Sequence, residues 1–236
     1  MGSVQDQVAH GRWTIPDLVL IAFAGLVGSA VGLGIVGQGS ELTATLIGQF
    51  FFTVGAVAVV GRVRRRDYRR LGFLVEGRDA MMVVLGMGLQ VALAVAFLPV
   101  ALVVGLETDP QVLTGEVAAI GGLFRRMAVF LLIGLIGPVL EEVMFRGILI
   151  DALAARFERR GVIFWSATAF AAFHLTGISM VQPMESAAVL VPQLILFGMV
   201  LAHLRISRGR LGPAIFTHAG FNLLSLLVLI FYPEFA

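Results

Sequence analysis

Residues 127–155 read MAVFLLIGLIGPVLEEVMFRGILIDALAA, an apolar run that carries Glu141, Glu142 and Arg146 near its middle. A helix that crosses ~30 Å of hydrocarbon needs about 20 mainly apolar residues, and this run is long enough. Charged side chains at that depth cost roughly 2.5–3.5 kcal/mol each on insertion scales and usually serve a function. The run therefore predicts a membrane-spanning helix that carries a functional site.

The composition of the whole chain agrees with a lipid environment. Of its 236 residues, 58% are hydrophobic and only 14% are charged, whereas soluble domains have about 45–50% apolar and about 25% charged residues. The absence of cysteine excludes disulfides, thiolate metal sites and cysteine nucleophiles. The high pI does not indicate nucleic-acid binding, because the positive charge is arginine in short loops between apolar runs.

The same length criterion predicts seven membrane spans. They cover 18–37, 42–61, 80–105, 127–155, 162–175, 187–204 and 211–231, and 112–123 can hold a partial eighth helix. The expected fold class is an all-α polytopic bundle of about seven to eight transmembrane helices. We expect N-terminal helices and loops over 1–126, a site-bearing core over 127–231, and no separate soluble domain.

Arginines are concentrated in three of the predicted loops. The loop between the second and third spans holds seven of them, and the loops that follow the fourth and sixth spans hold three each. Cytoplasmic loops are enriched in arginine and lysine. We therefore expect a multi-pass protein of the cell membrane with a cytoplasmic N-terminus, an external C-terminus and a site open toward the cytoplasm.

Helix geometry relates the polar residues within the spans. Glu142 and Arg146 are four residues apart and can form an ion pair. His218 and Asn222 are also four residues apart, so they share one face of their helix. Adjacent residues point about 100° apart, so Glu141 is expected to project away from Glu142. At ~1.5 Å per residue, Glu141 and His174 fall in the same layer of the bilayer as the polar residues of the last span.

These residue types suffice for attack of water on an amide carbonyl. A carboxylate such as Glu141 can act as a general base, and a neutral histidine can share a water proton, bind a metal or donate to an oxyanion. The amide of Asn222 can also donate to an oxyanion without changing charge.

Each polar residue also has a structural interpretation. Glu142 with Arg146 can be a purely structural ion pair, and Asn222 can form an ordinary interhelical hydrogen bond. Gln193 can line the same cavity or satisfy a backbone kinked by Pro192. His203, at a helix end, is expected to be interfacial, and His10 is given no role.

Three motifs, in order on three predicted spans, resemble a known family. They are Glu141-Glu142-x-x-x-Arg146, Phe170-x-x-x-His174 and His218-x-x-x-Asn222. Together they resemble the signature of the CPBP family, also called Abi. That family includes type II CAAX prenyl endopeptidases and bacteriocin-processing or self-immunity proteins. The resemblance covers about 127–227.

The resemblance implies an intramembrane endopeptidase. Glu141 would activate the hydrolytic water with His174 as its partner, and His218 and Asn222 would stabilise the oxyanion. Glu142, Arg146 and Phe170 would support the site. Family members are commonly described as metalloproteases, so zinc held by His174, His218 and Glu141 is one interpretation and a metal-free mechanism is the other.

The expected partners are a membrane-anchored or peptide substrate and the lipid bilayer, without nucleic acid. Two alternatives from other functional classes stay open. One is a non-catalytic immunity or scaffold protein that keeps the motif for packing. The other is an ion-coupled transporter, in which carboxylates and histidines form a relay; transporters often contain inverted repeats, and this sequence shows none.

Overall fold

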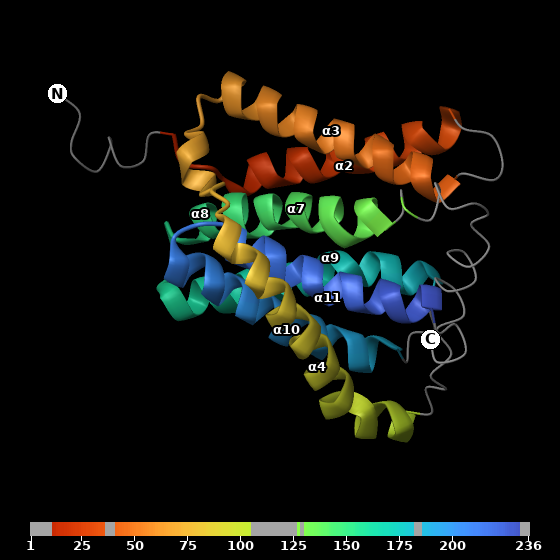
Figure 1. The fold of residues 1–236 in the computed structure, drawn as a ribbon. Helices are drawn as coiled ribbons and strands as arrows, with labels where there is room; N and C mark the ends of the chain where they lie inside the picture. The colour runs from red at the N-terminus through yellow and green to blue at the C-terminus, as the bar shows by residue number, and fades with distance from the viewer. Residues whose placement is uncertain (1–10, 36–40, 105–126, 128–129, 182–185, 232–236) are drawn as a thin grey trace.

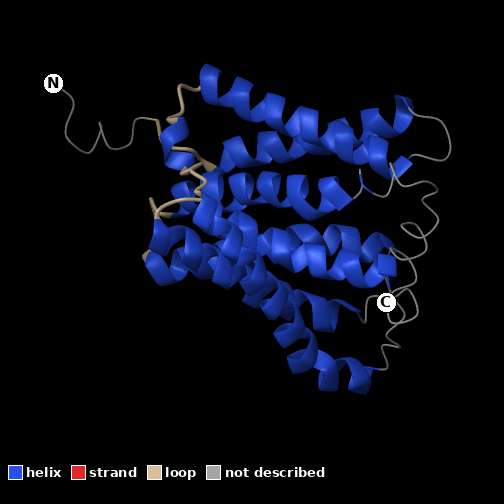
Figure 2. Cartoon of the chain, viewed as in Figure 1, coloured by secondary structure: helices blue, strands red, loops and turns tan. Residues whose placement is uncertain are grey.

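The computed structural model describes residues 11–35, 41–104, 127, 130–181 and 186–231. All regular structure in these ranges is helical, and Figure 2 shows no strand among them. The predicted all-α membrane-type fold is confirmed.

Helices occur at all seven predicted positions. The long ones are α2 (Ile15–Ile35), α3 (Glu41–Val63), α4 (Met82–Val104), α9 (Arg159–Val181), α10 (Ala187–Arg208) and α11 (Gly212–Phe231). The short turns η1 (Tyr68–Leu71) and η2 (Gly77–Met81) connect α3 to α4. The predicted end of the fifth span at residue 175 is wrong, because α9 continues to Val181. The predicted partial helix within 112–123 lies outside the described residues.

Three stretches are long and apolar enough to cross a membrane by length and composition. They are Ile15–Gly34, Gly77–Val104 and Ala187–Arg208. Helix α4 presents Val84, Val95 and Val103 outward with exposed fractions of 72%, 65% and 87%, which suits contact with lipid rather than water. For the other helices, crossing the bilayer stays a prediction.

The fourth predicted span is one helical rod with two widened segments. It consists of η3 (Leu132–Ile136), α7 (Gly137–Glu142), η4 (Val143–Leu149) and α8 (Ile150–Leu153), of which η3 and η4 are π-helical. Short π-helical segments in α-helices are rare and often lie at functional sites. Here they flank the segment that ends with Glu141 and Glu142.

The rod formed by α7 and its neighbours lies between two groups of helices (Figure 1). On one side α2 and α3 pack closely, and a Cβ on Gly28 would overlap the Gly48 carbonyl oxygen. On the other side lie α9, α10 and α11, with α4 crossing α11. A Cβ on Gly86 of α4 would overlap the carbonyl oxygen of Thr217, so the two backbones approach closely there.

The three arginine-rich loops meet at one end of the bundle, where Figure 2 shows the loops gathered. Arg70 pairs with Asp151 at 3.3 Å, and Arg205 donates to the Arg70 carbonyl oxygen at 3.1 Å. Buried Asp17 pairs with Arg64 at 3.1 Å and with Arg66 at 2.9 Å. These contacts place the arginine-rich segments at one end of the bundle, while their common position on the cytoplasmic side of a membrane stays a prediction.

Candidate active site

The carboxylate of Glu141 lies between two imidazoles that come from two other helices. Glu141 Oε2 is 3.4 Å from His174 Nε2 on α9 and 3.7 Å from His218 Nε2 on α11. The Glu141 side chain is 25% exposed, whereas that of Glu142 is fully buried. Of the two adjacent glutamates, Glu141 is therefore the one with exposed side-chain surface, and its Oε2 atom is buried against the two imidazoles.

Glu142 holds His218 from the opposite side of the ring. Glu142 Oε1 is 2.9 Å from His218 Nδ1 and 3.1 Å from Arg146 Nη1. Arg146 is also fully buried, and its Nη2 donates to the carbonyl oxygen of Gly198 on α10 at 3.2 Å. The predicted Glu142–Arg146 pair is confirmed, and it links the rod to both α10 and α11.

Phe170 packs at the centre of this cluster and is 1% exposed. The Arg146 guanidinium lies 4.3 Å from the centre of its ring, within the range of a cation–π contact. The same ring lies 4.4 Å from the His174 ring and 5.7 Å from the His218 ring, centre to centre. Phe170 therefore fixes the spacing of the two imidazoles and excludes water from the arginine side.

The hydrogen-bond partners of the two histidines determine their tautomers. His174 Nδ1 is 2.9 Å from the Phe170 carbonyl oxygen, which can only accept, so Nδ1 carries the proton. His218 Nδ1 must donate to the Glu142 carboxylate for the same reason. When the rings are neutral, both Nε2 atoms are acceptors that face Glu141. Three acceptors around one point suit a water molecule that donates both of its protons.

Asn222 contributes an amide to the same region. Its Nδ2 donates one hydrogen to the carbonyl oxygen of Ile133 at 3.1 Å, and its second N–H is left for another acceptor. Asn222 and Glu141 both line a cavity of about 130 Å³. Since a water molecule occupies about 30 Å³ in the liquid, this cavity has room for several. The predicted interhelical hydrogen bond of Asn222 exists, and it leaves a donor free.

The structure brings together the residues predicted from the three motifs. Glu141, His174, His218 and Asn222 converge, with Glu142, Arg146 and Phe170 behind them. The His218 ring contacts both carboxylates, Glu142 through Nδ1 and Glu141 through Nε2, which helical spacing alone did not predict. Gln193 instead donates to the Leu93 carbonyl oxygen at 3.4 Å and ties α10 to α4. His203 is exposed, and His10 lies outside the described residues.

Sequence reasoning missed two polar residues on α3. Gln49 and Thr53 line the cavity opposite Glu141. They are four residues apart in an apolar helix, so they share one face, and this spacing was the signal that could have identified them.

The described residues do not form a ready-made metal site. No three His, Asp or Glu side chains among them are arranged to hold a metal ion. Zinc held by His174, His218 and Glu141 stays a prediction that metal analysis of the purified protein can test.

Comparison with known families agrees with the motifs. Residues 123–224 match the family described as type II CAAX prenyl endopeptidase Rce1-like. This segment contains all four converging residues, and the match confirms the resemblance to CAAX protease-like proteins. No match was found among curated proteins or among solved structures.

Proposed function

We propose that this chain, a CAAX protease-like protein over residues 123–224, is an intramembrane endopeptidase in which Glu141 activates water. The observation that carries the proposal is the convergence of Glu141 Oε2 with the Nε2 atoms of His174 and His218, 3.4 and 3.7 Å away. The expected substrate is a peptide or a membrane-anchored protein.

In the proposed reaction a water molecule donates one hydrogen bond to Glu141 and a second to His174 Nε2, and its second proton stays on the oxygen that becomes part of the new carboxyl group. This leaves its lone pair free to attack a carbonyl carbon of the substrate. As the C–O bond forms, Glu141 takes the first proton. The C–N bond then breaks, and the proton passes from Glu141 to the leaving amine. No covalent bond to the protein forms, so one water molecule is consumed for each peptide bond.

The oxyanion needs a donor that is in place before the reaction. The second N–H of Asn222 can provide it, since its first is held by Ile133. His218 can add positive charge if it accepts a proton at Nε2, because Glu142 would stabilise the resulting imidazolium through Nδ1. The proposed role of His218 is thus electrostatic, as its neutral tautomer has no Nε2 proton to donate.

The experiment compares wild type, Glu141→Gln and Glu158→Gln in nanodiscs with a peptide library, and cleavage is read by mass spectrometry. Glu158 is an exposed glutamate in the loop before α9 and serves as the matched control. Loss of a general base typically costs 10²–10⁴-fold, so Glu141→Gln should lose at least about 100-fold while Glu158→Gln keeps wild-type activity. Equal cleavage by all three proteins would contradict the assignment of Glu141 as the base. No cleavage by wild type would contradict the protease and favour the scaffold or transporter alternatives.

A further inference from the structure

An apolar groove of about 860 Å³ leads to the Glu141 cavity from the arginine-rich end of the bundle. One wall is α3, through Phe50, Val54 and Val57. The other walls are the segment from η1 to Leu74 and residues Val139, Leu140 and Val143 of the rod. Its volume lies within the ~300–1,000 Å³ that is typical of ligand pockets.

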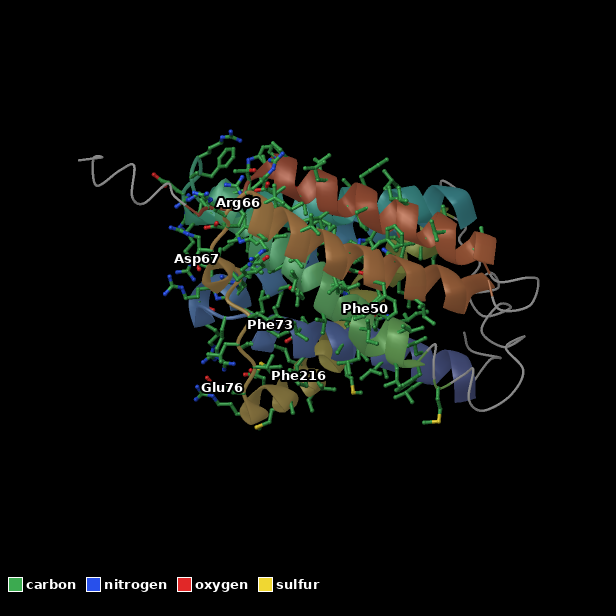
Figure 3. The ribbon with its side chains drawn as sticks, turned by 90° about the horizontal axis from the view of Figure 1, so that it is seen from above. Phe50, Arg66, Asp67, Phe73, Glu76 and Phe216 are labelled. Carbon is green, nitrogen blue, oxygen red and sulfur yellow. The ribbon has the colours of Figure 1, made fainter. Side chains whose placement is uncertain are left out.

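The groove and the Glu141 cavity share a boundary, which we call the neck. Phe50, Thr53 and Leu140 line both of them, so these three side chains lie at the boundary between the groove and the cavity. Two of the three belong to α3, which lies outside the segment that matches the family. Figure 3 labels Phe50, above the rod, and Phe73 of the connecting segment, which line the groove from two different elements.

The size of the inner cavity determines the form of the occupant. A helix with its side chains is about 10–12 Å wide, which a cavity of about 130 Å³ cannot hold. An extended segment can place one peptide unit beside Glu141 and leave the flanking residue in the groove.

The charges at the outer end of the groove are already paired. Arg69 binds Asp67 at 3.1 Å, and this hydrogen bond holds the pKa of Asp67 below its usual value, so the pair stays ionised at neutral pH. Arg210 is paired with Asp79 and with Glu76. Because both arginines have carboxylate partners, the groove selects for apolar surface rather than for negative charge.

We propose that Phe50 of α3 determines specificity, by contacting an apolar side chain of an extended polypeptide substrate next to the bond that is cleaved. This inference rests on the proposed function for the identity of the occupant. The selection itself is a property of the groove and its neck, and it acts on binding as well as on cleavage.

The test uses fluorescent peptides that differ only in one apolar residue, alanine or phenylalanine, beside the cleaved bond. Phe50→Ala widens the neck and should raise the phenylalanine-to-alanine ratio of kcat/KM by about tenfold, within the range for hydrophobic pockets. Phe50→Leu should give a smaller shift and covers the case in which Phe50→Ala fails to fold. Phe23→Ala is the matched control, because Phe23 on α2 is 65% exposed and lines neither cavity.

A binding measurement separates this inference from the proposed function. Anisotropy of the same peptides with Glu141→Gln, with and without Phe50→Ala, reports selection in the absence of cleavage. If Phe50→Ala changes the ratio of peptide affinities but wild type cleaves no peptide, the inferred role of Phe50 is supported and the proposed protease function is contradicted. An unchanged ratio in Phe50→Ala and Phe50→Leu, or an equal shift in Phe23→Ala, would overturn the inference.

Discussion

Glu141 and Glu142 are neighbours in the sequence, yet their carboxylates lie in different surroundings. Glu142 is fully buried between Arg146 and His218, while Glu141 reaches the cavity. A buried carboxylate without a partner costs several kcal/mol, and the arginine offsets most of that cost. In the proposed mechanism Glu142 is therefore a positioning residue, which fixes the tautomer of His218 and leaves Glu141 to act on water.

This division of roles predicts different effects for single and paired substitutions. Glu142→Leu leaves Arg146 buried and unpaired and should destabilise the protein by about 3–5 kcal/mol. Glu142→Leu combined with Arg146→Met removes both charges and should recover most of that stability, measured by denaturant unfolding in detergent.

Activity should not recover with stability. In the paired variant nothing holds the Nδ1 proton of His218, so kcat should stay at least about 100-fold below wild type with little change in KM. Nitrogen NMR of the histidine rings should show mixed tautomers at His218 in this variant. Wild-type kcat in the paired variant would mean that Glu142 is only a structural residue.

At the scale of elements, the site depends on how closely α4 crosses α11, because α11 carries His218 and Asn222. A Cβ on Gly86 would overlap the Thr217 carbonyl oxygen, and one on Gly220 would overlap the Val83 carbonyl oxygen. Both contacts lie on the stretch of α11 that carries His218 and Asn222, so the crossing helps to fix the position of that stretch relative to the rod.

Two glycines on α4 give a matched test of this crossing. Gly86→Ala should destabilise the protein by about 1–3 kcal/mol through overpacking and should lower kcat by displacing α11. Gly88→Ala should be neutral or slightly stabilising, because nothing lies within 4 Å of its Cβ and alanine favours helices. Thermal unfolding and peptide cleavage measure both effects. If the two variants behave alike, α4 does not position the site.

The sequence predicted the helices and the motif residues because apolar length and helical spacing are local properties. The spacing of Glu142 and Arg146 alone predicts their ion pair, and the three motifs fix which spans meet. The role of α3 was only partly predictable, because the spacing of Gln49 and Thr53 marks one polar face of the helix but not what that face contacts. Gln49, Phe50 and Thr53 lie in an ordinary apolar helix, and only tertiary packing decides which face turns toward Glu141. The π-helical widening around α7 likewise has no local signal.

At the scale of the whole molecule, the arginines of three loops gather at one end of the bundle. The Arg70–Asp151 ion pair and the hydrogen bond from Arg205 to the Arg70 carbonyl oxygen link the arginine-rich segments at one end. The groove, which Arg69 and Arg210 help to line, lies at the same end. A substrate that reaches Glu141 through this groove would enter from that end. If the arginine-rich end faces the cytoplasm, as predicted, the substrate enters the groove from the cytoplasmic side.

Cysteine labelling can test the orientation directly, since the chain contains no cysteine. Cysteines at Arg159 and Arg208 should react with a membrane-impermeant maleimide only in inverted vesicles, because both positions are exposed at the arginine-rich end. A cysteine at Ser40, in the predicted external loop, should react in intact cells. Labelling of Arg159→Cys and Arg208→Cys from opposite sides would contradict the arrangement.

Attack by water, rather than by a protein side chain, is tested most directly by cleavage in heavy-oxygen water under single-turnover conditions. Direct attack by water predicts that the new carboxyl terminus of the product carries one heavy oxygen and that Glu141 carries none. A first-turnover product without heavy oxygen, together with a covalent adduct on Glu141, would contradict it.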